Sequence, residues 1–383
     1  MKRISVLLTS LALASTYLPA TAQAEGKERS GFDKAWSYMT LYENKESSII
    51  QKFSIVGRIQ LDSVWVDPDT VWIDPEDVAG SETEKYNDVS WRRARLGFKA
   101  KMFNDWTAHI EADWKLNEPI DQWYNKLTDA YLAWQPTKEL KIKALKQSAG
   151  FTLDGATSSK RLLTMERNNL TNNLWFTKEY FTGILASGKF AGNGSYKGSF
   201  FSSGGDPGWD FDSASWFTFW SVGYKLGNTK LALDYVYQDE DENANTRDFE
   251  QVFSLHGQWQ NGPWGIRGDL SGGKGFEDLG QSDVWGLYIM PSYDITEHTQ
   301  VVLAYTYVAS DEDNGVRLPR YEDKAVGGRG NNYNEYYAGF NVFFYGHKFK
   351  WQTGLSWADM DDDADDGGEY EGWNLTTGLR VYW

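Results

Sequence analysis

Residues 92–115 read RRARLGFKAKMFNDWTAHIEADWK and alternate between apolar and polar side chains on both sides of a short turn. Before the turn at Asn104 and Asp105, Leu96 and Phe98 alternate with arginine and lysine. After it, tryptophan, alanine and isoleucine alternate with threonine, histidine and carboxylates. A period of two is typical of a β-strand, whereas an amphipathic helix repeats every 3.6 residues. The stretch therefore predicts a β-hairpin with one apolar and one charged face.

The same alternation is present near both ends of the chain. Residues 53–62 alternate in this way, and in the last strand Leu375, Leu379 and Val381 alternate with polar residues or glycine. The chain ends on the aromatic residue Trp383. A terminal strand with a free edge invites pairing with another chain. We therefore expect the last strand to pair with the first and to close the sheet.

Applying the same rule to the whole chain predicts sixteen strands. They span 53–66, 89–102, 106–116, 125–135, 139–148, 179–190, 194–203, 213–226, 229–240, 248–260, 263–272, 281–293, 299–310, 333–345, 348–359 and 372–383. Most of them are longer than the five or six residues of an average soluble strand, and they match the 9 to 11 residues of a tilted transmembrane strand. The apolar face then contacts lipid and the charged face lines water.

The connections between these strands alternate between short and long. The short ones are 103–105, 136–138, 191–193, 227–228, 261–262, 294–298 and 346–347. The long ones are 67–88, 117–124, 149–178, 204–212, 241–247, 273–280, 311–332 and 360–371. Short periplasmic turns opposite long external loops are typical of bacterial outer-membrane barrels. We therefore predict an all-β fold, a 16-stranded antiparallel transmembrane β-barrel formed by residues 51–383.

The composition agrees with this interpretation. Of the 383 residues 16% are aromatic, with 19 tryptophans, and none is cysteine, which excludes a disulfide scaffold and a thiolate metal site. The net charge of −16 gives no basis for binding nucleic acid. We expect aromatic girdles at the two membrane interfaces, because many tryptophans lie near predicted strand ends. These are Trp65, Trp91, Trp106, Trp114, Trp134, Trp264, Trp351 and Trp357.

Two segments precede the predicted barrel. Residues 1–24 combine Lys2 and Arg3, a short apolar run and the terminal Ala22-Gln23-Ala24, which predicts a cleaved signal peptide and export to the outer membrane. Residues 25–50 form an N-terminal periplasmic segment, in which aromatic and apolar residues from Phe32 to Tyr42 recur at roughly helical spacing. Outer-membrane lipid and lipopolysaccharide are then the expected surroundings of the mature chain.

Basic residues follow the predicted water-filled face. Seven lie on the first five strands and three on the loop 149–178: Arg58, Arg93, Arg95, Lys99, Lys101, Lys141 and Lys143, then Lys160, Arg161 and Arg167. Rings of arginine or lysine are a common device of anion pores, which predicts a passive, anion-selective diffusion channel. The alternative is that Glu111, Asp113 and Asp129 neutralise these cations and leave a weakly selective general porin.

Several stretches also resemble a known family. They are WRRARLGFK (91–99), TDAYL (128–132), FTL (151–153), TSSK (157–160), MER (165–167), RYE (320–322) and GHKFK (346–350). Together they resemble the phosphate-selective porin O and P family. The resemblance implies a homotrimeric channel, an in-folded third external loop and selection of phosphate, pyrophosphate or polyphosphate. Family members commonly carry a GKFKPPF-like run where this chain has LKQSAGF at 145–151, with Lys146 retained and Ser148 in place of a second lysine.

Other functions have weaker support in the sequence. A carbohydrate porin would use aromatic rings in the lumen, for which Tyr131 and Tyr382 are candidates. An outer-membrane hydrolase would need a serine beside a histidine such as His109, and no catalytic motif is present. We therefore predict no catalytic residue, metal site or cofactor. Acidic runs near 239–242, 311–313 and 359–366 are expected to form a solvated external rim, or to bind divalent cations at the lipopolysaccharide surface.

Overall fold

The computed structural model describes residues 30–71, 85–174, 179–204, 215–364 and 368–383. The predicted signal peptide lies outside these ranges, as do parts of the predicted loops 67–88, 149–178, 204–212 and 360–371. The chain divides into two compact units, Met1–Tyr38 and Met39–Trp383. None of the helices in the described ranges is long and apolar enough to cross a bilayer.

The described part of the first unit contains one helix, α2 (Gly31–Ser37). Its N-terminus is a capping box, because the Ser30 hydroxyl accepts from the Asp33 N–H and the Asp33 carboxylate accepts from the Ser30 N–H, both at 3.1 Å. The rings of Phe32 and Trp36 pack edge to face within the helix. The predicted helical spacing is therefore confirmed for these two residues but not for Tyr42, which lies on a strand.

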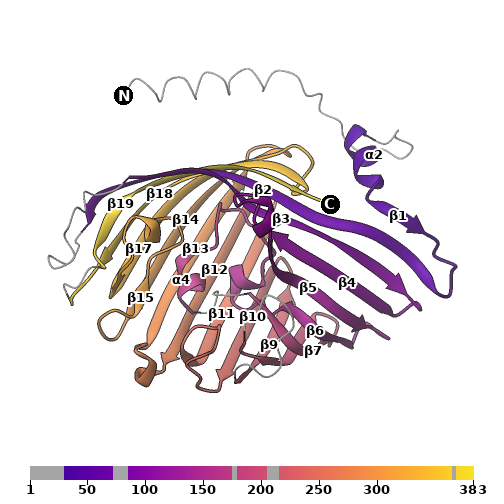
Figure 1. Cartoon of the computed structure of the whole chain (residues 1–383), viewed down its shortest axis with the longest axis horizontal. Helices are drawn as coiled ribbons and strands as arrows, with labels where there is room; N and C mark the ends of the chain where they lie inside the picture. The colour runs from indigo at the N-terminus through magenta and orange to yellow at the C-terminus, as the bar shows by residue number, and fades with distance from the viewer. Residues whose placement is uncertain (1–29, 72–84, 175–178, 205–214, 365–367) are drawn as a thin grey trace. The chain divides into compact units, whose positions relative to one another are not determined.

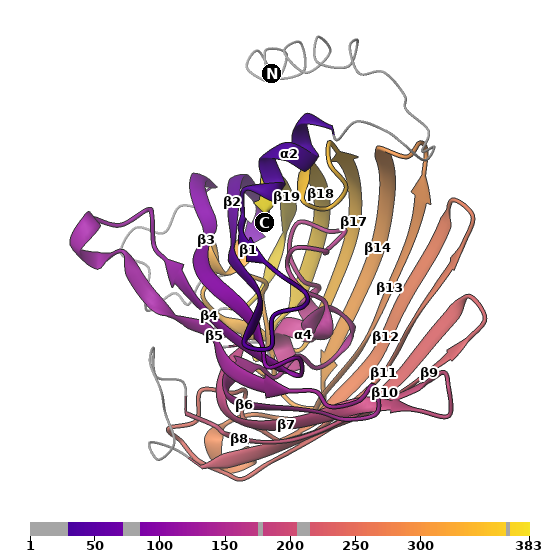
Figure 2. The same cartoon turned by 90° about the vertical axis from the view of Figure 1, so that its right-hand side faces the viewer.

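The second unit is a closed antiparallel barrel of sixteen long strands (Figures 1 and 2). These are β2 (Ile50–Val71), β3 (Tyr86–Met102), β4 (Trp106–Trp114), β5 (Tyr124–Trp134), β6 (Lys141–Ser148), β7 (Tyr180–Phe190), β8 (Gly194–Ser202), β9 (Trp216–Leu226), β10 (Thr229–Gln238), β11 (Phe249–Asn261), β12 (Trp264–Gly275), β13 (Val284–Asp294), β14 (Thr299–Ser310), β17 (Asn332–Phe343), β18 (Phe349–Asp361) and β19 (Tyr370–Tyr382). The predicted strand number and antiparallel order are confirmed.

The barrel closes between its last and first strands. β19 pairs with β2 from Tyr382 opposite Arg58 onward, and Trp383 and Gly57 exchange two backbone hydrogen bonds. β2 begins before that point, so its first residues would present an unpaired edge. The short strand β1 (Thr40–Glu43) pairs with β2 there, in line with the end of β19.

The connections divide the barrel into a short-turn end and a long-loop end, as predicted. The long loops carry short elements of their own: η1 (Ile120–Gln122), α3 (Leu153–Ala156), α4 (Asn169–Leu174), η2 (Glu277–Leu279), β15 (Val316–Arg317), η3 (Glu322–Lys324) and β16 (Arg329–Gly330). The acidic residues 311–313 are exposed, as expected for a rim. Asp359 and Asp361 lie on β18 rather than in a loop, and 365–367 fall outside the described residues.

Side chains on the outer surface are apolar and aromatic throughout the barrel. Leu96 and Phe98 are exposed on the outside of β3, whereas Arg93 and Arg95 on the same strand are buried toward the inside. Trp65, Trp106 and Trp264 are also exposed on the outside. This arrangement is the one that an apolar solvent around the barrel requires.

The two sides of the inner surface differ in composition. From β8 to β14 many inward residues are apolar and fully buried, for example Phe217, Val252 and Val302. They form a hydrophobic core inside the barrel with the third long loop, residues 149–179, which we call L3. Helix α4 of L3 packs against β12, β13 and β14, and Figure 2 shows it within the ring of strands. The prediction of a charged inner face is therefore wrong for these apolar positions, because they face L3 instead of water.

A second long loop also reaches into the barrel. Tyr321, in the loop 311–331 between β14 and β17, is buried and donates to the carboxylate of Asp62 on β2 at 3.0 Å. Leu318 and Val326 of this loop belong to the internal hydrophobic core. The family resemblance implied an in-folded third loop alone, so this insertion is an additional feature.

The packing of L3 gives a first testable prediction. Phe151 is fully buried and meets the Phe219 ring edge to face at 6.0 Å. Truncation in Phe151→Ala should cost about 3–5 kcal/mol of local stability. We expect trypsin to cleave L3 after Lys160 or Arg161 faster than in the unaltered chain, and the open-channel current to become noisier.

The matched control is Phe200→Ala, because Phe200 is half exposed on the outside of β8. It should leave L3 cleavage unchanged. Equal cleavage rates for Phe151→Ala and the unaltered chain would contradict the role assigned to this packing.

Candidate functional site

L3 is held to the barrel wall by carboxylates at its start. The backbone N–H of Thr152 donates to Asp234 on β10 at 3.0 Å, and that of Leu153 donates to Asp269 on β12 at 2.8 Å. Both carboxylates are buried. Hydrogen bonds to a charged acceptor are stronger than neutral ones. These contacts fix the point where L3 leaves the wall.

The middle of L3 is bound to the opposite wall. The Leu162 carbonyl accepts from the Lys350 ammonium at 2.6 Å, and the Leu163 carbonyl accepts from Asn341 at 3.0 Å and Gln352 at 3.2 Å. These donors come from β17 and β18. L3 therefore crosses the lumen from the β10–β12 side to the β17–β18 side.

Helix α4 is held from the long-loop end. The Arg317 carbonyl accepts from the side chains of Asn169 and Asn173 at 2.9 and 3.0 Å, and the Arg317 N–H donates to Asn173 at 2.7 Å. Arg247, from the loop between β10 and β11, donates to the Asn172 carbonyl at 3.0 Å. With L3 covering the β8–β14 side, the charged residues of β2–β5 line the remaining passage.

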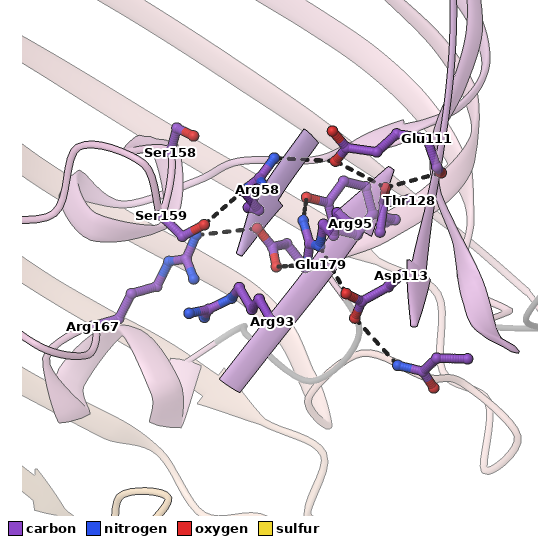
Figure 3. Close-up of polar contacts among 12 residues, drawn as sticks. Arg58, Arg93, Arg95, Glu111, Asp113, Thr128, Ser158, Ser159, Arg167 and Glu179 are labelled. Atoms are coloured by element: carbon purple, nitrogen blue, oxygen red, sulfur yellow. Dashed lines mark hydrogen bonds and ion pairs between the residues drawn. The ribbon is translucent and has the colours of Figure 1, made fainter. Parts of the chain in front are cut away.

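Arg58 and Glu111 form a buried ion pair at this passage (Figure 3). The Nη2 atom of Arg58 lies 3.1 Å from Glu111 Oε1, and Nη1 donates to the Ser159 hydroxyl of L3 at 2.7 Å. Thr128 donates to the Glu111 backbone carbonyl at 3.0 Å. The pair therefore joins β2 and β4 to L3.

Arg95 and Arg167 share the carboxylate of Glu179 (Figure 3). Arg167 lies 3.1 Å from Glu179 and Arg95 lies 3.9 Å from it, while Arg95 also pairs with Asp113 at 3.2 Å. Burial opposes ionisation of Glu179, but Arg167 and Arg95 outweigh it and lower the pKa of Glu179 to about 2. Glu179 therefore stays charged at any physiological pH.

Arg92 and Arg93 both reach Glu166 of L3. Arg92 Nη2 donates to Glu166 Oε2 at 2.9 Å, and Arg93 Nη2 lies 3.6 Å from the same oxygen. Consecutive strand residues normally face opposite sides, but a register shift opposite Gln60 and Leu61 brings both side chains into the lumen. Although burial opposes it, Arg92 holds the pKa of Glu166 well below its usual range.

The predicted arginines of the passage are thus paired. Arg58, Arg93, Arg95 and Arg167 each lie within 4.0 Å of a carboxylate. This matches the sequence-based alternative in which lumen charges neutralise one another. The arginines fix L3 in place, and much of their charge is balanced locally.

The predicted lysines lie in a different environment. Lys99, Lys141 and Lys143 are on the lumen face toward the short-turn end, and Lys160 is on L3. No carboxylate in the described ranges lies within 4.0 Å of these four ammonium groups. The Lys143 ammonium lies 4.1 Å from the centre of the Tyr131 ring, and that of Lys160 lies 5.2 Å from the Tyr382 ring. Burial, and then Arg58, lower the pKa of Lys160 to about 8.

The remaining predicted residues belong neither to the paired arginines nor to the four lysines without a close carboxylate. Lys101 is exposed at the end of β3, and Arg161 is exposed on L3. Lys146 is buried near the end of β6, where Leu145 has a positive φ of 84°.

Sequence reasoning also missed residues that belong with these groups. Lys197 on β8 lies over the Phe219 ring at 5.4 Å, and the alternation of its strand could have placed it in the lumen. The inward side chain of Arg92 depends on a bulge that no pattern in the chain marks. The acidic partners Glu166 and Glu179 lie in a loop without periodicity.

Two cavities lie on opposite sides of L3. The one toward the long-loop end has a volume of about 720 Å³ and is lined by Arg92, Arg93 and Arg95 as well as by loop residues. The other, toward the short-turn end, measures about 680 Å³ and is lined by α3 and by residues such as Lys189 and Lys230.

The histidine considered for hydrolysis has no serine beside it. The His109 ring meets the Tyr131 ring edge to face at 5.3 Å, and its buried Nε2 has no hydrogen-bond partner among the described residues. The described residues also contain no group of three or more His, Cys, Asp or Glu that could hold a metal ion.

Comparison with known proteins identifies the same architecture. The family model described as phosphate-selective porin O and P matches residues 68–383. The chain resembles the anion-selective porin from Comamonas acidovorans at 10% identity and a TM-score of 0.61, over 86% of this chain and 99% of that one. It also resembles outer-membrane expressed OmpT of Vibrio cholerae at 12% identity and a TM-score of 0.58, over 89% and 100% of the two chains.

The trimer form of Vibrio cholerae OmpT matches at 11% identity and a TM-score of 0.58, covering 86% of this chain and 99% of that chain. At these identities the structures show the fold alone. No curated protein matches the chain.

The shared carboxylate gives a second prediction. Glu179→Gln should leave Arg95 and Arg167 incompletely balanced and raise the preference for anions. A unit charge about 7 Å from a passing ion changes its energy in water by about 0.6 kcal/mol. Because this charge acts with opposite sign on an anion and a cation, we expect the anion-to-cation permeability ratio, measured from reversal potentials in a KCl gradient, to rise about eightfold.

The pH dependence provides the check. Because the pKa of Glu179 is about 2, its charge is lost only below that pH. The anion-to-cation permeability ratio of Glu179→Gln should therefore exceed that of the unaltered channel by the same factor from pH 4 to 7. A difference that disappears when the pH falls from 7 to 4 would show that Glu179 titrates there, against this account.

Proposed function

Because the chain belongs to the phosphate-selective porin O and P family, we propose that this outer-membrane porin is a passive, anion-selective diffusion channel for phosphate or polyphosphate. Like its structural neighbours it is a porin and not an enzyme. Solutes move down their gradients without an energy source.

The observation that carries the proposal is the separation of paired arginines from lysines without a close carboxylate. The arginines at L3 are balanced by Glu111, Glu166 and Glu179. Lys99 and Lys143 on the lumen wall and Lys160 on L3 have no described carboxylate within 4.0 Å. Such lysines attract anions into the passage, and this excess sets the ion preference.

The same lysines account for release as well as binding. An ammonium group is a compact charge that replaces part of an anion's hydration shell, and each one binds only weakly in water. The aromatic rings beside Lys143 and Lys160 hold these side chains against the wall. An anion therefore passes from one lysine to the next instead of being held at one site.

A weakly selective general porin is the second candidate, and one observation favours it. The arginines expected to select anions are neutralised, and Ser148 replaces a lysine that family members carry. A carbohydrate porin has less support, because the Tyr131 and Tyr382 rings are covered by lysine ammonium groups. Phosphate titration distinguishes these possibilities, since only a phosphate-binding channel saturates at low phosphate concentration.

We also propose that the channel is a homotrimer in outer-membrane lipid. Its fold matches a porin described in a trimer form. The outward residues Ala108 and Ala112 of β4 are small, which suits close contact between barrels, whereas β10–β13 carry large outward residues such as Leu233 and Trp285.

The direct test is the reversal potential of the purified protein in a KCl gradient. The channel should prefer chloride over potassium, and phosphate should reduce the chloride current in a saturable way. Combined replacement Lys99→Gln, Lys143→Gln and Lys160→Gln should lower the anion-to-cation ratio roughly 400-fold, because each charge changes the energy of the anion by about 0.6 kcal/mol and that of the cation by the same amount with opposite sign.

The matched control replaces Lys45, Lys101 and Lys138 by glutamine, which removes the same charge from exposed positions that line neither cavity. It should change the ratio little. Because the pKa of Lys160 is about 8, Lys160→Arg should keep anion preference to higher pH than the unaltered channel. An unchanged ratio in the triple lysine variant would refute the proposal.

A further inference from the structure

The cavity toward the long-loop end has a second wall that carries the opposite charge. Arg92 and Arg93 line one part of it, and Glu322 of η3 and Glu335 of β17 line another. Glu322 is 2% exposed. The two carboxylates interact electrostatically with each other. They belong to none of the contacts that hold L3.

These two carboxylates contact only neutral groups. Asn374 donates its amide to Glu322 at 2.9 Å, and the Thr306 hydroxyl donates to Glu335 at 3.3 Å. No arginine, lysine or histidine in the described ranges lies within 4.0 Å of either one. A buried acid such as Glu322 is costly without a cation, whereas the carboxylates at L3 are each paired.

Two buried hydroxyl groups belong to the same patch. Tyr333 is 0% exposed and Tyr370 is 1% exposed, and neither hydroxyl has a hydrogen-bond partner among the described residues. The charged groups that act most strongly on both hydroxyls are Glu322 and Glu335. Buried tyrosine hydroxyls ordinarily have a partner, so these two point to a ligand group between them and the carboxylates.

We propose that Glu322, Glu335, Tyr333 and Tyr370, which we call the acidic patch, bind a primary ammonium group, so that the channel admits zwitterionic solutes. An ammonium group offers three donors and no acceptor. It can donate to both carboxylates and to a phenol oxygen. The anionic end of the same solute then faces the arginine wall of the cavity.

Binding of an ammonium group by the acidic patch requires that the protein is a channel, as proposed above, but it does not require that the channel prefers anions. Burial raises the pKa of Glu322, and a bound ammonium group would favour its charged form. The solute class is therefore an amine that also carries a phosphonate, phosphate or carboxylate.

The test compares two probes that differ by one amine. In planar bilayers, 2-aminoethylphosphonate and ethylphosphonate are titrated separately as blockers of the chloride current at pH 7.5. The aminophosphonate should block at about tenfold lower concentration, the change expected for one charge-assisted contact. Glu335→Gln and Glu322→Gln should each reduce this difference, while block by ethylphosphonate should not weaken.

The control is Asp323→Asn, which removes an exposed carboxylate adjacent to Glu322. It should preserve the tenfold difference. Equal block by the two probes in the unaltered channel, or an undiminished difference in both glutamine variants, would overturn the proposal. Reversal potentials from the same membranes report anion preference separately, so a failure of the proposed function is distinguishable from a failure of the acidic patch.

Discussion

The packing of L3 against one side of the barrel interior determines where a solute can pass. Its apolar residues, with Phe151 and Leu170 fully buried, fill the space in front of β8–β14. Gly286 permits this approach, because a side chain there would meet Leu170 and the Tyr307 carbonyl. Asp234 and Asp269 hold the start of the loop by its backbone N–H groups. Water and solutes are left with the charged side formed by β2–β5.

The charges on that side serve two purposes. Buried arginines pair with carboxylates because an unpaired charge is costly at such a site, and the planar guanidinium can contact several oxygens at once. The pairs join β2, β3 and L3 into one rigid constriction (Figure 3). Lys143 and Lys160 lie over aromatic rings instead, so their charge remains available to ions. The arginines thus hold the constriction together, and the lysines set the ion preference.

Much of the fold could be predicted from the period-two pattern, because lipid imposes an apolar outer face on every strand. The inner face could not be predicted as well, since apolar residues such as Phe217 point inward where L3 covers them. Arg58 and Arg95 were placed in the lumen correctly, but their partners in L3 lie far away in sequence. Arg92 was missed because a bulge reverses its direction. The acidic patch was missed because Glu322 comes from a loop without periodicity.

The central claim is that lysines below L3 make the passage attractive to anions. The chain contains no cysteine, so a single Lys143→Cys variant reports on that position alone. The measurement is the rate at which this cysteine reacts with a negatively charged sulfonatoethyl methanethiosulfonate and with a positively charged trimethylammonium analogue. The account predicts that the negative reagent reacts about tenfold faster after correction for the rates with a free thiol. Equal rates, or a faster positive reagent, would contradict it.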